Sequence, residues 1–152
     1  MFRGSSSLAL DSKGRLAIPA RYREAILKVC DGSMVVTLNN TKERCLWLYT
    51  VDQWIMVEQK IVELPSFNPE HQKLKRFMVG HANDVEMDGN GRILLPAHLR
   101  EFAGMTKSVF MIGQGNKFEI WSEDLWVARR AEWLKEVPDP SAITLEMEQL
   151  SI

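Results

Sequence analysis

Hydrophobic and polar positions follow the same order of patterns twice along the chain. Alternating apolar residues predict short strands at residues 5–10, 15–18, 34–38 and 45–49, and again at 109–112 and 117–121. Tight turns are predicted at DSKG and DGNG, where aspartate and glycine favour them. Short helices are predicted over 20–29 and 97–102, because Pro19 and Pro96 stop the preceding strand and fit the first helical position. Each half is expected to run strand, turn, strand, short helix, strand, loop, strand.

Three longer helices are predicted between and after the two halves. Thr50 and Gln53 have the spacing of a capping box, and an apolar stripe with helical spacing continues from them: Trp54, Val57, Ile61 and Leu64. A second helix is expected over residues 68–77 and a third over 123–136. The last stretch, ITLEMEQLSI, has little pattern and is expected to be loose.

Individual residues are repeated as well as patterns. Residues 11–23 read DSKGRLAIPARYR and residues 88–100 read DGNGRILLPAHLR. Without gaps, six residues of the first copy fall on identical residues of the second: Asp11, Gly14, Arg15, Pro19, Ala20 and Arg23 on Asp88, Gly91, Arg92, Pro96, Ala97 and Arg100. Further on, LWLYTVDQW at 46–54 matches FEIWSEDLW at 118–126. A module written twice predicts an internal pseudo-twofold.

The length and the repeat together predict the domain organisation. A chain of 152 residues usually forms one domain, or two small ones that share a core. We predict a mixed α+β, mainly β fold, with a first module over residues 5–52 and linker helices over 53–80. The second module is predicted over residues 81–124, with a C-terminal helix and a loose tail over 125–152.

Composition points to an ordinary soluble globular protein. The chain is 45% hydrophobic and 26% charged, both within the usual range. No apolar run approaches the roughly 20 residues that cross a bilayer, and the N-terminal apolar stretch is too short for a signal peptide. Cys30 and Cys45 form neither a CxxC pair nor a disulfide framework. We expect a cytoplasmic protein.

The residues that would carry enzymatic chemistry lack the required spacing. The three histidines, His71, His81 and His98, have no metal-ligand spacing to each other or to the cysteines. No nucleophile elbow or Ser-His-acid arrangement is present, and the G-x-G pairs lack the rest of a dinucleotide fingerprint. We therefore predict no catalysis, no cofactor, no metal and no small-molecule substrate.

Charge is segregated along the chain although the net charge is only −1. Residues 1–30 carry six lysines and arginines against two acidic residues, and residues 123–152 carry three against seven. One end of the molecule could therefore present a basic face while the other stays acidic. Chance segregation on a mixed surface is the alternative.

The repeated D-x-x-G-R motif carries the functional prediction. Arg15 and Arg92 each follow a turn glycine, so each guanidinium is expected to project from the base of an exposed turn. Its planar fork of donors suits phosphate oxygens or the acceptor edge of guanine. Lys13 and Asn90 within the turns could add contacts, and two such turns related by a twofold would suit a groove read by a β-ribbon.

A purely structural interpretation is also open. Asp11 and Asp88 precede their arginines by four residues and could simply pair with them across the turn. A surface pair of this kind contributes at most about 1 kcal/mol. However, a turn alone does not need arginine, and the motif occurs twice with the same identities.

The doubled motif, the opening MFRGSSSLALDSKGR and the segment FMVGHANDVEMDGNGR resemble the MraZ family of bacterial transcriptional regulators. The similarity covers residues 1 to about 135. It implies two AbrB-like (SpoVT-AbrB) modules that form a swapped-hairpin barrel. It also implies that the D-x-x-x-R pairs, Asp11 with Arg15 and Asp88 with Arg92, contact DNA. The second copy departs at His98, which stands in place of Arg21 and is only partly charged near neutral pH.

The resemblance also implies a function and partners. These are sequence-specific binding to double-stranded DNA at repeats upstream of the protein's own operon, and repression of the division and cell-wall gene cluster. It implies a ring-like homo-oligomer of octamer type, located in the cytoplasm and on the nucleoid. We expect Arg15 and Arg92 to make the main contacts, Asp11 and Asp88 to hold them, and four further residues to contact phosphates: Arg3, Lys13, Arg21 and Arg23.

The rival interpretation is an oligomeric scaffold that binds a protein partner through exposed aromatics, without DNA. The five tryptophans, at 47, 54, 121, 126 and 133, could also be stacking platforms for single strands. Their positions on apolar stripes favour core or subunit-interface anchors instead.

Overall fold

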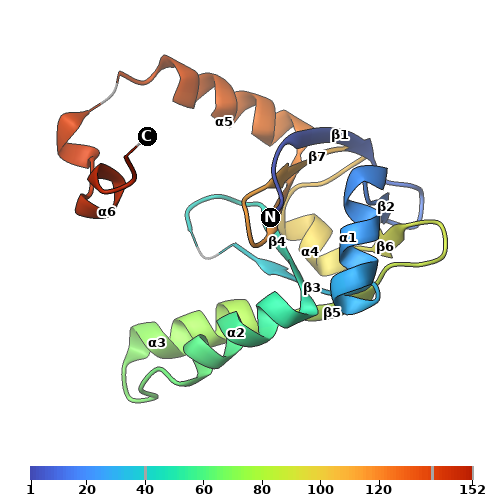
Figure 1. The fold of residues 1–152 in the computed structure, drawn as a ribbon, viewed down its shortest axis with the longest axis horizontal. Helices are drawn as coiled ribbons and strands as arrows, with labels where there is room; N and C mark the ends of the chain where they lie inside the picture. Colours follow the sequence, from blue (N-terminus) through green and yellow to red (C-terminus); the bar gives the residue numbers. More distant parts are fainter. Residues whose placement is uncertain (40, 138, 152) are drawn as a thin grey trace.

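The computed structural model describes residues 1–39, 41–137 and 139–151, and Figure 1 shows their arrangement. One antiparallel sheet has six strands in the order β1-β7-β8-β4-β3-β5, and a second sheet pairs β2 with β6. The strands are β1 Ser5–Ala9, β2 Arg15–Ala17, β3 Ser33–Leu38, β4 Leu46–Thr50, β5 Asn83–Glu86, β6 Arg92–Leu94, β7 Ser108–Gly113 and β8 Phe118–Ser122. The predicted α+β, mainly β class is confirmed.

The order of strands in the large sheet is symmetric between the two copies. Strands β1 to β4 of the first copy correspond to β5 to β8 of the second, and exchanging counterparts gives the same order read from the opposite edge. At one edge β1 pairs with β7, and at the other edge β5 pairs with β3. Two pairs of counterpart residues lie directly opposite each other: Leu16 with Ile93, and Trp47 with Glu119. The repeat in the sequence is therefore matched by an approximate twofold in the pairing.

Two strands around a tight turn would be expected to form a hairpin, but the strands predicted at residues 5–10 and 15–18 do not pair with each other, although the turn between them is present. β1 and β2 share only an isolated bridge between Leu10 and Leu16, and each takes its main partner from the other copy. β2 and β6 are three residues long, too short to bury their apolar side chains within one copy. Across the described ranges β1 and β5 do not pair with each other, so the sheet is open and the predicted barrel is not closed.

The small β2–β6 sheet is fixed to the core from its inner side. Leu16, Ile18, Ile93 and Leu95 are fully buried and belong to the cluster that also contains Phe118. Burying a side chain of this size contributes roughly 1.5–3 kcal/mol. The outer face of this sheet is therefore held on a well-packed base.

The short helices begin at the predicted residues, directly after the prolines, but the prolines hold a different position in them. Helix α1 spans Ala20–Cys30 and helix α4 spans Ala97–Phe102, with Pro19 and Pro96 at the N-cap rather than at the first helical position. Helix α2 spans Val51–Val62, but the expected capping box is wrong because the Thr50 side chain makes no cap hydrogen bond. Thr50 is buried instead.

The helix predicted over 68–77 changes character along its length. It begins as α3, Pro69–Leu74, with the Asn68 side chain accepting a hydrogen bond from the Glu70 N–H, and continues as a π turn over Lys75–Val79. The buried Thr37 hydroxyl donates to the Met78 carbonyl at 2.6 Å. Met78 lies in the last turn of this helical segment, where carbonyls lack a partner within the helix, and the Thr37 hydroxyl satisfies one of them.

Two helical arms extend from the sheets, and the motif lies at the opposite end. Figure 1 shows α2 and α3 side by side, and α5, Glu123–Lys135, leading away from the body to α6, Leu145–Glu148. Residues 140–142 form a single 3-10 turn. The stretch predicted as loose, ITLEMEQLSI, contains the short helix α6, whose residues are all exposed. β2, β6 and the loops before them lie at the other side of the view.

Candidate nucleic-acid interface

The repeated motif builds two turns with the same hydrogen bonds, here named tip 1 (residues 11–15) and tip 2 (residues 88–92). In tip 1 the Asp11 N–H donates to the Arg15 carbonyl at 3.0 Å, and in tip 2 the Asp88 N–H donates to the Arg92 carbonyl at 2.8 Å. Asp11 Oδ1 accepts from the N–H groups of Lys13 and Arg15, both at 2.9 Å. Asp88 Oδ1 accepts the equivalent pair of bonds. The motif aspartate therefore shapes each turn through the backbone.

The second oxygen of each aspartate holds the arginine side chain. Asp11 Oδ2 lies 2.7 Å from Arg15 Nε, and Asp88 Oδ2 lies 3.2 Å from Arg92 Nε. Asp11 Oδ2 also lies 3.9 Å from Arg92 Nη1, which links the two tips. The arginine side chains remain 32% and 31% exposed. The aspartate–arginine ion pairs that the sequence suggested are therefore present, and they orient both guanidinium groups without burying them.

Strand pairing places the two arginines on one face. Arg15 lies opposite Leu94 and Arg92 lies opposite Ala17, with Leu16 and Ile93 paired between them. Leu16 and Ile93 point into the core, and side chains alternate along a strand. Arg15 and Arg92 therefore share the outer face of the β2–β6 sheet.

The electrostatics of the tips keep both aspartates ionised. Hydrogen bonds from the Arg15 backbone and side chain lower the pKa of Asp11 to about 2. The Arg92 backbone N–H likewise lowers the pKa of Asp88. At neutral pH each tip is thus a fixed carboxylate bound to a cationic group that faces solvent.

The residues predicted as lesser phosphate contacts lie in different parts of the surface. Lys13 is exposed within tip 1. Arg3 and Arg21 line one hollow of about 410 Å³ beside Tyr22, where Arg21 Nη2 donates to Ser6 Oγ at 2.8 Å. Arg23 has a different position, because its Nε donates to the Ile18 carbonyl at 2.7 Å.

The last arginine of each motif packs against the turn of the other copy. A Cβ added to Gly14 would lie 2.5 Å from Arg100 Cζ, and one added to Gly91 would lie 2.3 Å from Arg23 Nε. Both glycines have positive φ, +85° and +74°, a conformation that glycine adopts without cost. Sequence reasoning assigned no role to Arg100, although its identity with Arg23 in the repeat was a signal.

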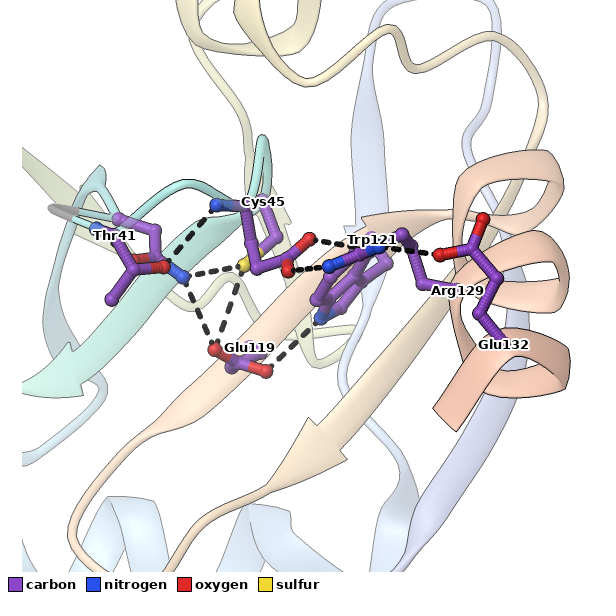
Figure 2. Close-up of polar contacts among 8 residues, drawn as sticks. Thr41, Cys45, Glu119, Trp121, Arg129 and Glu132 are labelled. Carbon is purple, nitrogen blue, oxygen red and sulfur yellow. Dashed lines mark hydrogen bonds and ion pairs between the residues drawn. The ribbon is translucent and has the colours of Figure 1, made fainter. Parts of the chain in front are cut away.

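A buried carboxylate also escaped the sequence prediction. Glu119 on β8 is 9% exposed and accepts hydrogen bonds from two indoles, Trp47 Nε1 at 3.0 Å and Trp121 Nε1 at 3.1 Å. Asn39 Nδ2 donates to it at 3.3 Å, and Figure 2 shows Cys45 and Trp121 beside Glu119. The only signal was a charged residue within an apolar strand pattern.

The chemistry of this cluster is structural. Burial, and secondarily the charge of Glu119, raises the pKa of the Cys45 thiol. The thiol therefore stays protonated and is a poor nucleophile. Trp54 and Trp121 are buried, whereas Trp133 is 37% exposed. The two buried tryptophans therefore have no free ring face on which a base of a single strand could stack.

The described ranges contain neither a metal site nor a membrane-spanning helix. No group of three or more His, Cys, Asp and Glu side chains there could hold a metal ion. No helix in the same part of the chain has the length and apolar character needed to cross a membrane.

Comparisons with known proteins give one consistent result. A family model described as "MraZ protein, putative antitoxin-like" matches residues 1–77 and 78–139. Proteins named "Transcriptional regulator MraZ" from Halorhodospira halophila and Coxiella burnetii are 47% and 48% identical over 153 residues, which cover the whole of both chains. A protein of the same name from Legionella pneumophila is 51% identical over 136 residues, 90% of this chain and 89% of the relative. Each copy of the motif lies within one of the two matched ranges.

Proposed function

The chain belongs to the MraZ family, as the doubled motif predicts, and from that premise we propose that it regulates transcription by binding double-stranded DNA through tips 1 and 2. The carrying observation is the pairing of β2 with β6, which brings Arg15 and Arg92 to one outer face beside a shared aspartate. A two-stranded ribbon fits the major groove, where arginine reads guanine. The relatives' name describes a regulator and not an enzyme, and we propose no catalytic activity.

Asp11 and Asp88 orient the arginines in this proposal and do not contact DNA directly. A carboxylate would repel a phosphate, but here its charge is bound to the neighbouring guanidinium and to two backbone N–H groups. Lys13, Arg3 and Arg21 are proposed as lesser phosphate contacts. Arg23 was predicted alongside them, but its Nε–H is already donated to Ile18.

Assembly compensates for the low net charge of −1 in this proposal. We propose a ring-like homo-oligomer of octamer type that repeats the paired tips around one face. Such a ring would engage several operator repeats at once, and linkage raises effective concentration without new contacts. The targets would be repeats upstream of its own operon and of division and cell-wall genes, with repression as the outcome, in the cytoplasm and on the nucleoid. The swapped-hairpin description and the modules over 5–52 and 81–124 are part of the same proposal.

The direct test is a fluorescence-anisotropy titration with DNA from just upstream of the protein's own gene, carrying one or several repeats. Arg15→Ala or Arg92→Ala should weaken binding about 10- to 100-fold, because a lost bidentate base contact costs roughly 1–3 kcal/mol. Arg130→Ala, an exposed change on α5, is the matched control. Size-exclusion chromatography checks that assembly is intact. Equal affinities for all four proteins would contradict the proposed site, and equal affinities for one and several repeats would contradict the linkage argument.

A scaffold without DNA binding is the second candidate. It is favoured by large exposed apolar residues on the helical arms, including Phe67, Trp133 and Val137, which suit a protein partner. Salt separates the two. DNA binding should fall by roughly 0.9 log units per neutralised phosphate for each log unit of salt, whereas apolar contacts should not weaken in this way.

A further inference from the structure

We propose that Arg100 is a positioning residue: from the second copy it holds tip 1, which carries Arg15, and Arg23 holds tip 2 in the same way from the first copy. The part of this inference that concerns DNA rests on the proposed function. It differs from what the order of residues suggests, because each tip depends on an arginine of the opposite copy.

The contact of Arg100 with tip 1 is close and directional. The guanidinium lies over Gly14, where an added Cβ would meet Cζ, Nε and Nη2 within 2.9 Å. Arg100 Nε donates to the Leu95 carbonyl at 3.0 Å, and the Leu95 N–H donates to the Gly14 carbonyl at 3.0 Å. Arg100, the residue after β6 and tip 1 are therefore joined by a continuous set of contacts.

The same contacts occur in the reverse direction. Arg23 lies over Gly91, and its Nε donates to the Ile18 carbonyl at 2.7 Å. The Ile18 N–H donates to the Gly91 carbonyl at 2.8 Å. Because equivalent residues form the contact in both copies, we infer that the contact is a feature of the repeated module.

Positioning matters because the DNA-reading group is a long side chain on a short turn. Arg15 is held by Asp11, and Asp11 is held by the turn backbone, which Arg100 covers. Binding groups must be kept within about 0.5 Å of their productive geometry by the residues that support them. A guanidinium supplies a flat, charged cover that fits a glycine, and the compact ammonium of lysine does not.

The first arm of the experiment needs no DNA. Amide hydrogen exchange, read by mass spectrometry, is compared for wild type, Arg100→Ala, Arg23→Ala and the control Arg130→Ala. Arg100→Ala should speed exchange in peptides covering residues 11–16 and leave residues 88–93 as in wild type, and Arg23→Ala should do the reverse. Three results would overturn the proposal. They are faster exchange only in the tip of the copy that carries the substitution, equally faster exchange in both tips, and unchanged exchange in both tips.

The second arm measures operator affinity. Arg100→Ala should weaken binding about tenfold, the effect of misplacing one contact worth roughly 1.4 kcal/mol. Adding Arg15→Ala to Arg100→Ala should then weaken binding less than Arg15→Ala does in wild type, since non-additivity marks coupled residues. Adding Arg92→Ala to Arg100→Ala should weaken binding as much as it does in wild type. Arg100→Lys keeps the charge and should behave like Arg100→Ala; wild-type affinity in this variant would mean that charge alone acts, and would reject the positioning role.

The two arms separate failure of the inference from failure of the proposed function. If wild type does not bind the operator, the proposed function fails, and the exchange pattern still decides whether each arginine holds the opposite tip. If each substitution speeds hydrogen exchange in the tip of the opposite copy but Arg100→Ala binds the operator as tightly as wild type, the positioning role in DNA binding is wrong.

Discussion

Replacing Gly14 with alanine should destabilise the protein by about 2–3 kcal/mol. A non-glycine residue at φ +85° costs roughly 1–2 kcal/mol. The new Cβ would also lie 2.5 Å from Arg100 Cζ, so the guanidinium must move away and lose its hydrogen bond to the Leu95 carbonyl. A hydrogen bond of this kind contributes about 0.5–1.5 kcal/mol.

The equivalent turn of the second copy, tip 2, supplies a control glycine. Gly89 has no atom within 4 Å of an added Cβ and is absent from the glycines with positive φ. Gly89→Ala should therefore change stability by less than about 0.5 kcal/mol. In an Arg100→Ala background, Gly14→Ala should cost only the backbone part, about 1–2 kcal/mol.

The assay is urea unfolding at one fixed protomer concentration, because the stability of an oligomer depends on concentration. The free energies of unfolding of wild type, Gly14→Ala, Gly89→Ala, Arg100→Ala and the Gly14/Arg100 double variant are compared. If Gly14→Ala is as stable as Gly89→Ala, neither the backbone conformation nor the arginine contact constrains the turn as described.

Three further predictions concern charged groups. The pKa of Asp11 is lowered to about 2 in the folded state from its ordinary value of 3.8, so its contribution to stability is present above about pH 4 and is lost as the pH falls toward 2. The stability advantage of wild type over Asp11→Asn should shrink across that window in urea unfolding, and a pH-independent difference would contradict this. Glu119→Gln should cost about 1–3 kcal/mol, because an amide leaves one buried indole N–H without its acceptor, while the exposed Glu136→Gln should be neutral in the same assay. Arg129→Ala removes an ion pair with Glu43 at a partly exposed site and should cost at most about 1 kcal/mol; a Tm drop as large as that of Glu119→Gln would show that this pair had been underestimated.

Local signals in the sequence were sufficient for most elements. The prolines and apolar spacings located α1 and α4 to within one or two residues, and the aspartate and glycine of each copy located both tips. These features depend on residues within a few positions of each other, which is what such patterns record. The paired arginines could be predicted for the same reason.

Pairing between copies could not be read from local pattern. The alternation at residues 15–18 is the same whether its partner is β1 or β6, because only long-range packing of Leu16 against Ile93 decides between them. Arg100 and Glu119 were missed for the same reason, since each also contacts a residue in the other copy of the repeat, Gly14 and Trp47 respectively. The hydrogen bond from the Thr37 hydroxyl to the π turn after α3 also joins residues that are distant in sequence.

The facing of Trp47 and Glu119 has a consequence for how a duplicated protein can diverge. In a dimer of identical subunits, the residue on the axis meets its own twin, and two glutamates there would repel while two tryptophans would crowd. When both halves are joined in one gene, the two residues at that position can differ. Here the Glu119 carboxylate accepts a hydrogen bond from the Trp47 indole at 3.0 Å. The central seam of the sheet can thus be specified by a heterotypic contact that symmetry would otherwise forbid, and exchange of one half for a copy of the other should be disfavoured at this point.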